Sequence, residues 1–169
     1  MSVVLRRGRA ADAAALHALI ASNVDAGHLL PRSPADLLAH AGRFIVAAER
    51  GRIIGCAELA PLSDHVAEVR SLVVDDAVRG RGTGGRLLEA LVQAAGAQGF
   101  TTLCAFAHEP SLFVRLGFAV VPHARVPEKI ARDCASCALF GRCGQYAVAF
   151  ALPAAAARAA VPRRLQVPA

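Results

Sequence analysis

The chain has 169 residues, of which 55% are hydrophobic, so it can bury one substantial core. Its 19 basic and 13 acidic residues give a net charge of +6, but the arginines are scattered and few aromatic residues accompany them, which argues against nucleic-acid binding. A hydrophobic signal core and a bilayer-length apolar run are both missing from the sequence, which favours a cytoplasmic protein with no membrane partner.

The first half of the chain predicts strands, two helices and a hairpin. Leu16, Leu19 and Ile20 recur at helical spacing, and Ser33 followed by Pro34 is typical of a helix start. Apolar runs on both sides of a short Arg-Gly-Arg turn predict a β-hairpin. The expected helices are residues 11–24 and 34–41, and the expected strands are 2–8, 43–49, 53–62 and 66–75.

The second half is predicted to alternate helices and strands before losing regularity. The expected helices are residues 84–98 and 110–116, and the expected strands are 101–107, 117–122 and 145–152. Residues 1–152 are therefore expected to form a single domain. Residues 153–169 are rich in alanine, proline and arginine and are expected to be a disordered tail.

A glycine-rich stretch, "VVDDAVRGRGTGGRLLEALVQAAG", leads into the expected helix 84–98. Glycines at a helix start allow an anion to approach backbone N–H groups that have no partner within the helix. A P-loop is excluded because the only lysine is Lys129. The spacing Gly80-x-Gly82-x-x-Gly85 also fits a dinucleotide-binding loop, but the neighbouring segments predict an antiparallel hairpin, not βαβ units.

The third possible spacing is Arg79-x-x-Gly82-x-Gly84. With this loop, the element order and the segment "FVRLGF", residues 3–152 resemble the GCN5-related N-acetyltransferases (GNAT). The resemblance implies a mixed α/β (α+β) fold whose mostly antiparallel, twisted sheet splays between its fourth and fifth strands. It also implies an acetyl-CoA-dependent enzyme. The implied coenzyme A contacts are Leu72, Val73, Val74, Arg79, Gly80, Arg81, Gly82, Thr83, Gly84 and Gly85.

Three further stretches, "HLLPRS", "AEVRSLVVD" and "PEKIARDCASCALFGRCGQYAVAF", resemble short stand-alone amino-acid N-acetyltransferases. These enzymes are similar to N-acetylglutamate synthase, which performs the first step of arginine biosynthesis. The resemblance implies direct acetyl transfer, within a ternary complex, to the α-amine of an acidic amino acid, with glutamate favoured. It places Arg32, Arg70, Cys56 and Lys129 in the substrate pocket and allows a homodimer.

The acid and base residues are less clearly indicated. Glu68 is the candidate general base, because a carboxylate can accept the proton that an α-ammonium must lose. Glu68 could instead be an ion-paired strand residue, and Glu58 is the second candidate base. Phe113 stands where the family commonly has a tyrosine that acts as the acid. Tyr146 is either a substitute for that tyrosine or a packed strand residue.

Five cysteines, an odd number, favour reduced thiols or a metal over a disulfide framework. Cys134, Cys137 and Cys143 have C-x2-C-x5-C spacing, which could hold zinc if His123 or Cys104 completed the set. Free thiols and reversible oxidation are the alternatives, and no metal ligand is assigned. The rival functions are a non-catalytic coenzyme A- or metal-dependent sensor and an acetyltransferase for another small amine.

Overall fold

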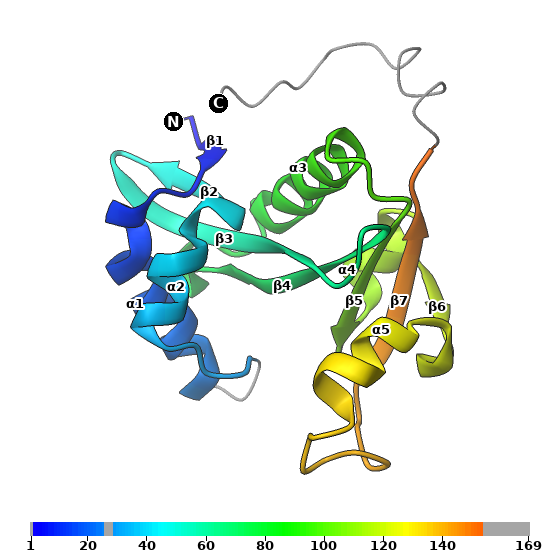
Figure 1. Cartoon of the computed structure of the whole chain (residues 1–169). Helices are drawn as coiled ribbons and strands as arrows, with labels where there is room; N and C mark the ends of the chain where they lie inside the picture. The colour runs from blue at the N-terminus through cyan, green and yellow to red at the C-terminus, as the bar shows by residue number, and fades with distance from the viewer. Residues whose placement is uncertain (1, 26–28, 154–169) are drawn as a thin grey trace. The chain divides into compact units, whose positions relative to one another are not determined.

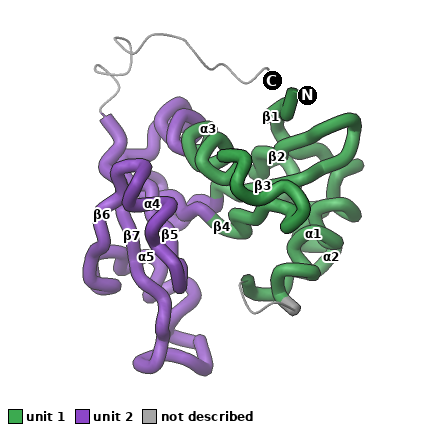
Figure 2. The backbone as a smooth tube through the Cα atoms, turned by 180° about the vertical axis from the view of Figure 1, so that it is seen from behind, with its two compact units in different colours: residues 1–59, 70–91, 162–169 green, residues 60–69, 92–161 purple. Residues whose placement is uncertain are grey.

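The computed structural model describes residues 2–25 and 29–153, which divide into two compact units (Figures 1 and 2). Among these residues, unit 1 contains 2–25, 29–59 and 70–91, and unit 2 contains 60–69 and 92–153. The strands form one mixed seven-stranded sheet of order β1-β2-β3-β4-β5-β7-β6, which is the expected fold class. A single domain over 1–152 stays a prediction, and the expected tail lies, except for Pro153, outside the described residues.

Unit 1 contains the predicted hairpin. Strand β2 (Phe44–Glu49) pairs antiparallel with β3 (Arg52–Pro61) and, on its other side, with β1 (Val4–Arg7). The two turn residues, Arg50 and Gly51, have φ values of 51° and 79°. Positive φ at both positions gives the turn a backbone twist that matches the twist of the two strands it connects. The predicted hairpin is confirmed.

One face of the sheet in unit 1 is covered by α1 (Ala13–Asp25) and α2 (Pro34–His40), as Figure 1 shows. Helix α2 starts as predicted, because the Ser33 hydroxyl accepts a hydrogen bond from the Asp36 N–H at 3.1 Å. The buried residues of this layer are Leu16, Ile20, Leu37, Phe44, Val46, Cys56 and Val73.

Helix α3 (Thr83–Ala97) packs on the opposite face of β3, and its Leu87 and Leu91 are fully buried. Gly55 lets this helix approach closely, because a Cβ there would lie only 3.1 Å from Leu87 Cδ1. The next residue along β3, Cys56, belongs to the core under α1 and α2. Alternate residues of β3 therefore support the two helix layers of unit 1.

Unit 2 is built on β5 (Thr102–Ala107), which pairs antiparallel with β7 (Tyr146–Ala151). Strand β7 also pairs antiparallel with the edge strand β6 (Ala119–Val121). The short helix α4 (Ser111–Arg115) places Phe113 against Phe118, with ring centroids 5.4 Å apart. This part of the core is therefore aromatic.

The segment between β6 and β7 contains more helix than the sequence predicted. It begins with a 3₁₀ turn (His123–Arg125) and continues as α5 (Pro127–Lys129) and a π-helical turn, η5 (Ile130–Cys134). Each of these helical pieces is too short to show apolar residues repeating at helical spacing, so the sequence did not predict them. The remaining 3₁₀ turns are Ala10–Asp12, Ala41–Arg43 and Asp76–Val78.

Strand β4 (Val66–Val74) separates from β5 as the fold class requires. Over the described residues, the parallel pairing of β4 with β5 covers only Val66 to Glu68. Ser71 has a φ of 49°, which is rare for a residue other than glycine. This left-handed residue interrupts the regular alternation of faces along β4. No helix in the described part of the chain is long and apolar enough to cross a membrane.

Candidate functional site

The glycine-rich loop ends at an open helix start in unit 1. Gly80 and Gly82 have φ values of 81° and 79°, and no atom lies within 4 Å of a Cβ built on either residue. The Arg86 N–H donates to the Gly82 carbonyl at 3.1 Å, so Gly82 precedes the first turn of α3. The backbone N–H groups at positions 83–85 therefore have no carbonyl partner within the helix. A helix start of this kind can accept a phosphate group, and the predicted anion site stays a prediction.

Arg79 fixes the shape of this loop. Its Nη2 donates to Asn23 Oδ1 at 2.7 Å and forms an ion pair with Asp76 at 2.7 Å, and its Nε donates to the Val74 carbonyl at 3.2 Å. The guanidinium therefore ties the loop to α1 and to the end of β4. Arg81 has a side chain that is 58% exposed, which leaves it better placed than Arg79 to meet an anion.

The other predicted cofactor contacts lie on β4, next to the left-handed Ser71. Val73 is buried in the core of unit 1, so only its backbone could meet a ligand. Leu72 and Val74 are half-buried. Thr83, the first residue of α3, is 3% exposed, and its side chain therefore packs inside the unit. In this region a ligand would meet mainly backbone groups and few side chains.

Arg32 is the centre of a polar network in unit 1. Its Nη1 donates to Glu58 Oε2 at 2.6 Å and to Ser71 Oγ at 3.2 Å, while its Nε donates to Asp36 Oδ2 at 2.6 Å. The guanidinium carbon also lies 5.9 Å from the centroid of the Phe44 ring. Arg32 therefore connects the loop before α2 with β3 and with the irregular residue of β4.

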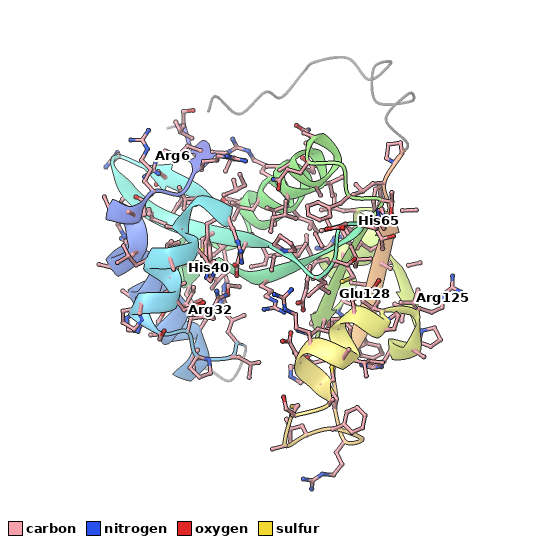
Figure 3. The ribbon with its side chains drawn as sticks, viewed as in Figure 1. Arg6, Arg32, His40, His65, Arg125 and Glu128 are labelled. Atoms are coloured by element: carbon pink, nitrogen blue, oxygen red, sulfur yellow. The ribbon has the colours of Figure 1, made fainter. Side chains whose placement is uncertain are left out.

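The two carboxylates that hold Arg32 differ in exposure. The side chain of Glu58 is 2% exposed, whereas that of Asp36 is 36% exposed and also contacts His40, labelled beside Arg32 in Figure 3. Burial opposes the charge of Arg32, but the hydrogen bonds to Glu58 and Asp36 raise its pKa overall. Burial likewise opposes the charge of Asp36, yet its pKa is lowered by Arg32. Arg32 is thus a charged group that already has two anionic partners.

Cys56 and Arg70 were expected near the substrate. Cys56 is fully buried, and its thiol donates to the Ser71 carbonyl at 3.6 Å. Burial raises the pKa of this thiol, which keeps it neutral and unreactive. Arg70 is half-buried on β4. The structure therefore connects Cys56 to the irregular point of β4 and gives its thiol a packing role.

A second polar network lies in unit 2, around Lys129. The Lys129 ammonium is 2.8 Å from Glu68 Oε1 and 2.8 Å from Asp133 Oδ2, and it lies 5.4 Å from the centroid of the Phe106 ring. Glu68 is 4% exposed and Asp133 is 36% exposed. Glu68 is therefore a buried, ion-paired carboxylate, which is the alternative that the sequence left open beside the general base.

The two networks share a feature that the sequence analysis missed. Asp36 and Asp133 each follow their cation by four residues. This spacing is visible in the sequence, but it indicates contact only between residues of one helix, and Arg32 lies in the loop before α2. Glu58 could not be paired with Arg32 in this way, because the two residues are 26 positions apart.

The structure gives the leaving group no acid at Phe113. This residue is buried and packs edge-on against Phe118. Tyr146 is 51% exposed, so the interpretation of a packed strand residue is wrong. Its position at the first residue of β7 leaves it open to solvent.

The cysteine segment does not form a metal-binding cluster. Within residues 2–25 and 29–153, no group of three or more His, Cys, Asp or Glu residues is placed to hold a metal ion. Cys134, Cys137 and Cys143 are free thiols, of which the last two are exposed. Cys104, suggested as an additional ligand, is buried in β5.

Comparison with known proteins agrees with the architecture. The model of the acetyltransferase (GNAT) domain matches residues 40–120. An uncharacterized N-acetyltransferase of Chlorobaculum tepidum is 30% identical over 144 residues, covering 85% of this chain and 93% of the relative. An amino-acid acetyltransferase of Mycobacterium tuberculosis is 28% identical over 131 residues, covering 75% of this chain and 74% of the relative.

Among solved structures, the chain is similar to N-acetylglutamate synthase from Neisseria gonorrhoeae in complex with coenzyme A and N-acetyl-glutamate. The TM-score is 0.81 at 25% identity, and the match covers 90% of this chain and 36% of that one. The chain therefore spans about a third of the length of that synthase.

Proposed function

The chain belongs to the GNAT family of acetyl-CoA-dependent N-acetyltransferases, and from this membership we propose that its acceptor is the α-amine of an acidic amino acid, with L-glutamate favoured. This activity would make it N-acetylglutamate synthase-like and place it at the first step of arginine biosynthesis. The proposal draws support from the amino-acid acetyltransferase of Mycobacterium tuberculosis and from the gonococcal synthase bound to N-acetyl-glutamate.

The observation that carries the cofactor part is the open start of α3 at Gly82. We propose that the pyrophosphate of coenzyme A is bound by the N–H groups at 83–85, with charge from Arg81. Leu72 and Val74 lie beyond the residues that pair with β5, and we propose that their backbone groups bind the pantetheine arm. Arg79 acts on the shape of the loop.

For the chemical step, we propose that the amine attacks the thioester directly within a ternary complex. Glu68, directly or through water, accepts the proton that the ammonium loses. The thiolate of coenzyme A leaves without a protein acid at position 113, because a thiolate is a good leaving group in water. No covalent enzyme intermediate forms.

For the acceptor, the proposal treats Arg32 of unit 1 and Lys129 of unit 2, each taken by itself, as candidate cations for a substrate carboxylate. Each cation has one buried carboxylate partner and one that is 36% exposed. Binding of substrate would exchange the exposed partner, Asp36 or Asp133, for a substrate carboxylate, because this exchange leaves the buried charges paired. Arg70 and the backbone of Cys56 are proposed as further substrate contacts.

A panel of amino acids tests the acceptor. Leucine and alanine lack the second carboxylate, so we expect glutamate to have a kcat/KM at least about a hundredfold higher than theirs. Aspartate and glutamine are the close competitors, since the first is shorter and the second keeps the shape but not the charge. The measurement is release of free thiol from acetyl-CoA. A preference for a neutral or basic amine would overturn the acidic acceptor and leave the acetyltransferase activity standing.

Arg32→Lys tests the role of Arg32 in the same assay. Lysine keeps a positive charge near Glu58 but loses the planar fork that grips a carboxylate with two hydrogen bonds. We expect the KM for glutamate to rise about tenfold or more, and the KM for acetyl-CoA to stay unchanged. Equal changes in the two values would mean that Arg32 acts on the whole fold.

Glu68→Gln tests the base. If Glu68 accepts the proton, the variant should lose about a hundredfold in kcat at neutral pH and less at alkaline pH, where free amine is abundant. Lys129 keeps Asp133 as a partner in this variant, so unfolding is not expected. Asp133→Asn is the matched control, because it removes the other partner of Lys129. A loss of the same size at all pH values in Glu68→Gln would show an electrostatic role.

A cytoplasmic location stays a prediction of the sequence, and the resemblance allows a homodimer without predicting one. Light scattering on the purified protein measures the second directly, and a monomeric mass at micromolar concentration would contradict it.

A further inference from the structure

The cysteine-rich segment of unit 2 is not used by the proposed reaction. It follows the π-helical turn η5 and leads to β7, at the yellow-to-orange part of the chain in Figure 1. Cys134 is the last residue of η5 and is half-buried, whereas Cys137 is exposed. The structure contains these thiols in reduced form, without a metal-binding arrangement among the described residues.

Cys134 and Cys137 lie on one tight turn. The Cys137 N–H donates to the Cys134 carbonyl at 3.0 Å, an i to i+3 hydrogen bond. A turn of this kind keeps its first and last Cα atoms within about 7 Å of each other. A disulfide needs a Cα separation of about 4.4–6.8 Å, so the two thiols can be joined with little movement of the backbone.

Exposure makes Cys137 the member of the pair that a reagent reaches first. The Leu139 N–H donates to Cys137 Sγ at 3.4 Å. The thiol of Cys134 has its pKa raised, mainly by burial and also by Cys143, Asp133 and Cys137. Cys134 is therefore suited to react second, with a sulfur that is already bonded to Cys137.

We propose that Cys134 and Cys137 form a reversible thiol-modification site for low-molecular-weight disulfides such as oxidised glutathione. The Cys137 thiolate attacks one sulfur of the reagent, which forms a mixed disulfide and releases one thiolate. Cys134 then loses its proton and attacks the Cys137 sulfur, which closes the protein disulfide and releases the second thiolate. Two protein thiols lose two protons and two electrons, and the reagent gains the electrons.

The site is connected to the Lys129 network through η5. Asp133 immediately precedes Cys134 and pairs with the Lys129 ammonium at 2.8 Å. The Ala135 N–H donates to the Ile130 carbonyl at 2.9 Å, which closes the π-helical turn next to Cys134. A disulfide would fix the turn that directly follows Asp133 and thereby hinder Asp133 from giving way to a substrate carboxylate at Lys129. This inference rests on the proposed function, in which Lys129 binds the acceptor. We therefore expect the disulfide to weaken acceptor binding.

Peptide mapping tests the disulfide without reference to activity. Trypsin cuts after Arg132 and Arg142, so residues 133–142 form one peptide that contains both thiols, while Cys143 falls in the next peptide. After incubation of the whole protein with oxidised glutathione, this peptide should be lighter by two hydrogen atoms and resist alkylation. Dithiothreitol should restore alkylation.

Two variants sharpen the experiment. Cys137→Ser should abolish the closed disulfide, whereas Cys143→Ser should leave it unchanged. Persistent alkylation of both thiols in the wild-type protein, or a cross-link between the two tryptic peptides, would overturn the proposal. One equivalent of zinc in protein purified without chelator would also overturn it, because zinc would hold the thiols as ligands.

Kinetics measure the coupling separately. In the oxidised wild-type protein, the KM for the acceptor should rise at least about threefold, with the KM for acetyl-CoA unchanged, and Cys137→Ser should be insensitive to the reagent. Disulfide formation without a change in the acceptor KM would retain the modification site and refute its connection to Lys129.

Discussion

Gly82→Val is expected to abolish acetyl-CoA binding and to leave the chain folded. Gly82 has a φ of 79° and precedes the first turn of α3. A β-branched residue strains this backbone conformation, and its side chain would occupy the open space beside the N–H groups proposed to bind the pyrophosphate. We expect a loss of at least about a hundredfold in affinity, measured by calorimetry.

Gly51→Val is the matched control for this substitution. Gly51 also has a φ of 79° and no atom within 4 Å of an added Cβ, but it lies in the turn between β2 and β3. The strain should therefore cost both variants a similar stability, of about 1–3 kcal/mol. Only Gly82→Val should lose affinity for acetyl-CoA. Equal affinities in the two variants would refute the assignment of the loop.

Arg32→Ala is expected to lower the free energy of unfolding by about 3–5 kcal/mol, because it leaves a buried carboxylate without its ion-pair partner. That carboxylate belongs to Glu58, which is 2% exposed and lies 2.6 Å from Arg32 Nη1. Chemical denaturation of the wild-type and variant proteins measures the difference. The size of the loss is the reason for testing acceptor binding with Arg32→Lys.

Asp36→Asn removes the other partner of Arg32 and should cost less than about 1 kcal/mol, since Asp36 is more exposed. Its effect should also depend on pH. The folded-state pKa of Asp36 is lowered, so its charge contributes stability above the pKa of the unfolded chain and loses this contribution as the pH falls through the folded pKa. Wild type and Asp36→Asn should therefore converge in acid. A loss as large as that of Arg32→Ala would contradict the difference in burial.

Local signals decided much of the fold. The N-cap at Ser33 and the Arg50-Gly51 turn were predicted because each depends on a few adjacent residues whose backbone preferences are strong. The helix after the glycine loop was expected at residues 84–98 and observed at Thr83–Ala97. Short helical turns near Lys129 escaped prediction, because fewer than two turns of helix show no apolar period.

By itself, the sequence determined the family and the position of the glycine-rich loop, because both depend on glycines and strands that are close together along the chain. Only the tertiary structure decided how the charges are paired. Arg32 and Glu58 are 26 positions apart in the sequence, and Lys129 and Glu68 are 61 positions apart, so no local pattern connects them. Arg79 fixes the loop and Ser71 interrupts β4. Neither role could be predicted from the sequence, for the same reason. A side chain's partners depend on which elements pack together, and burial then sets how strongly those partners hold it.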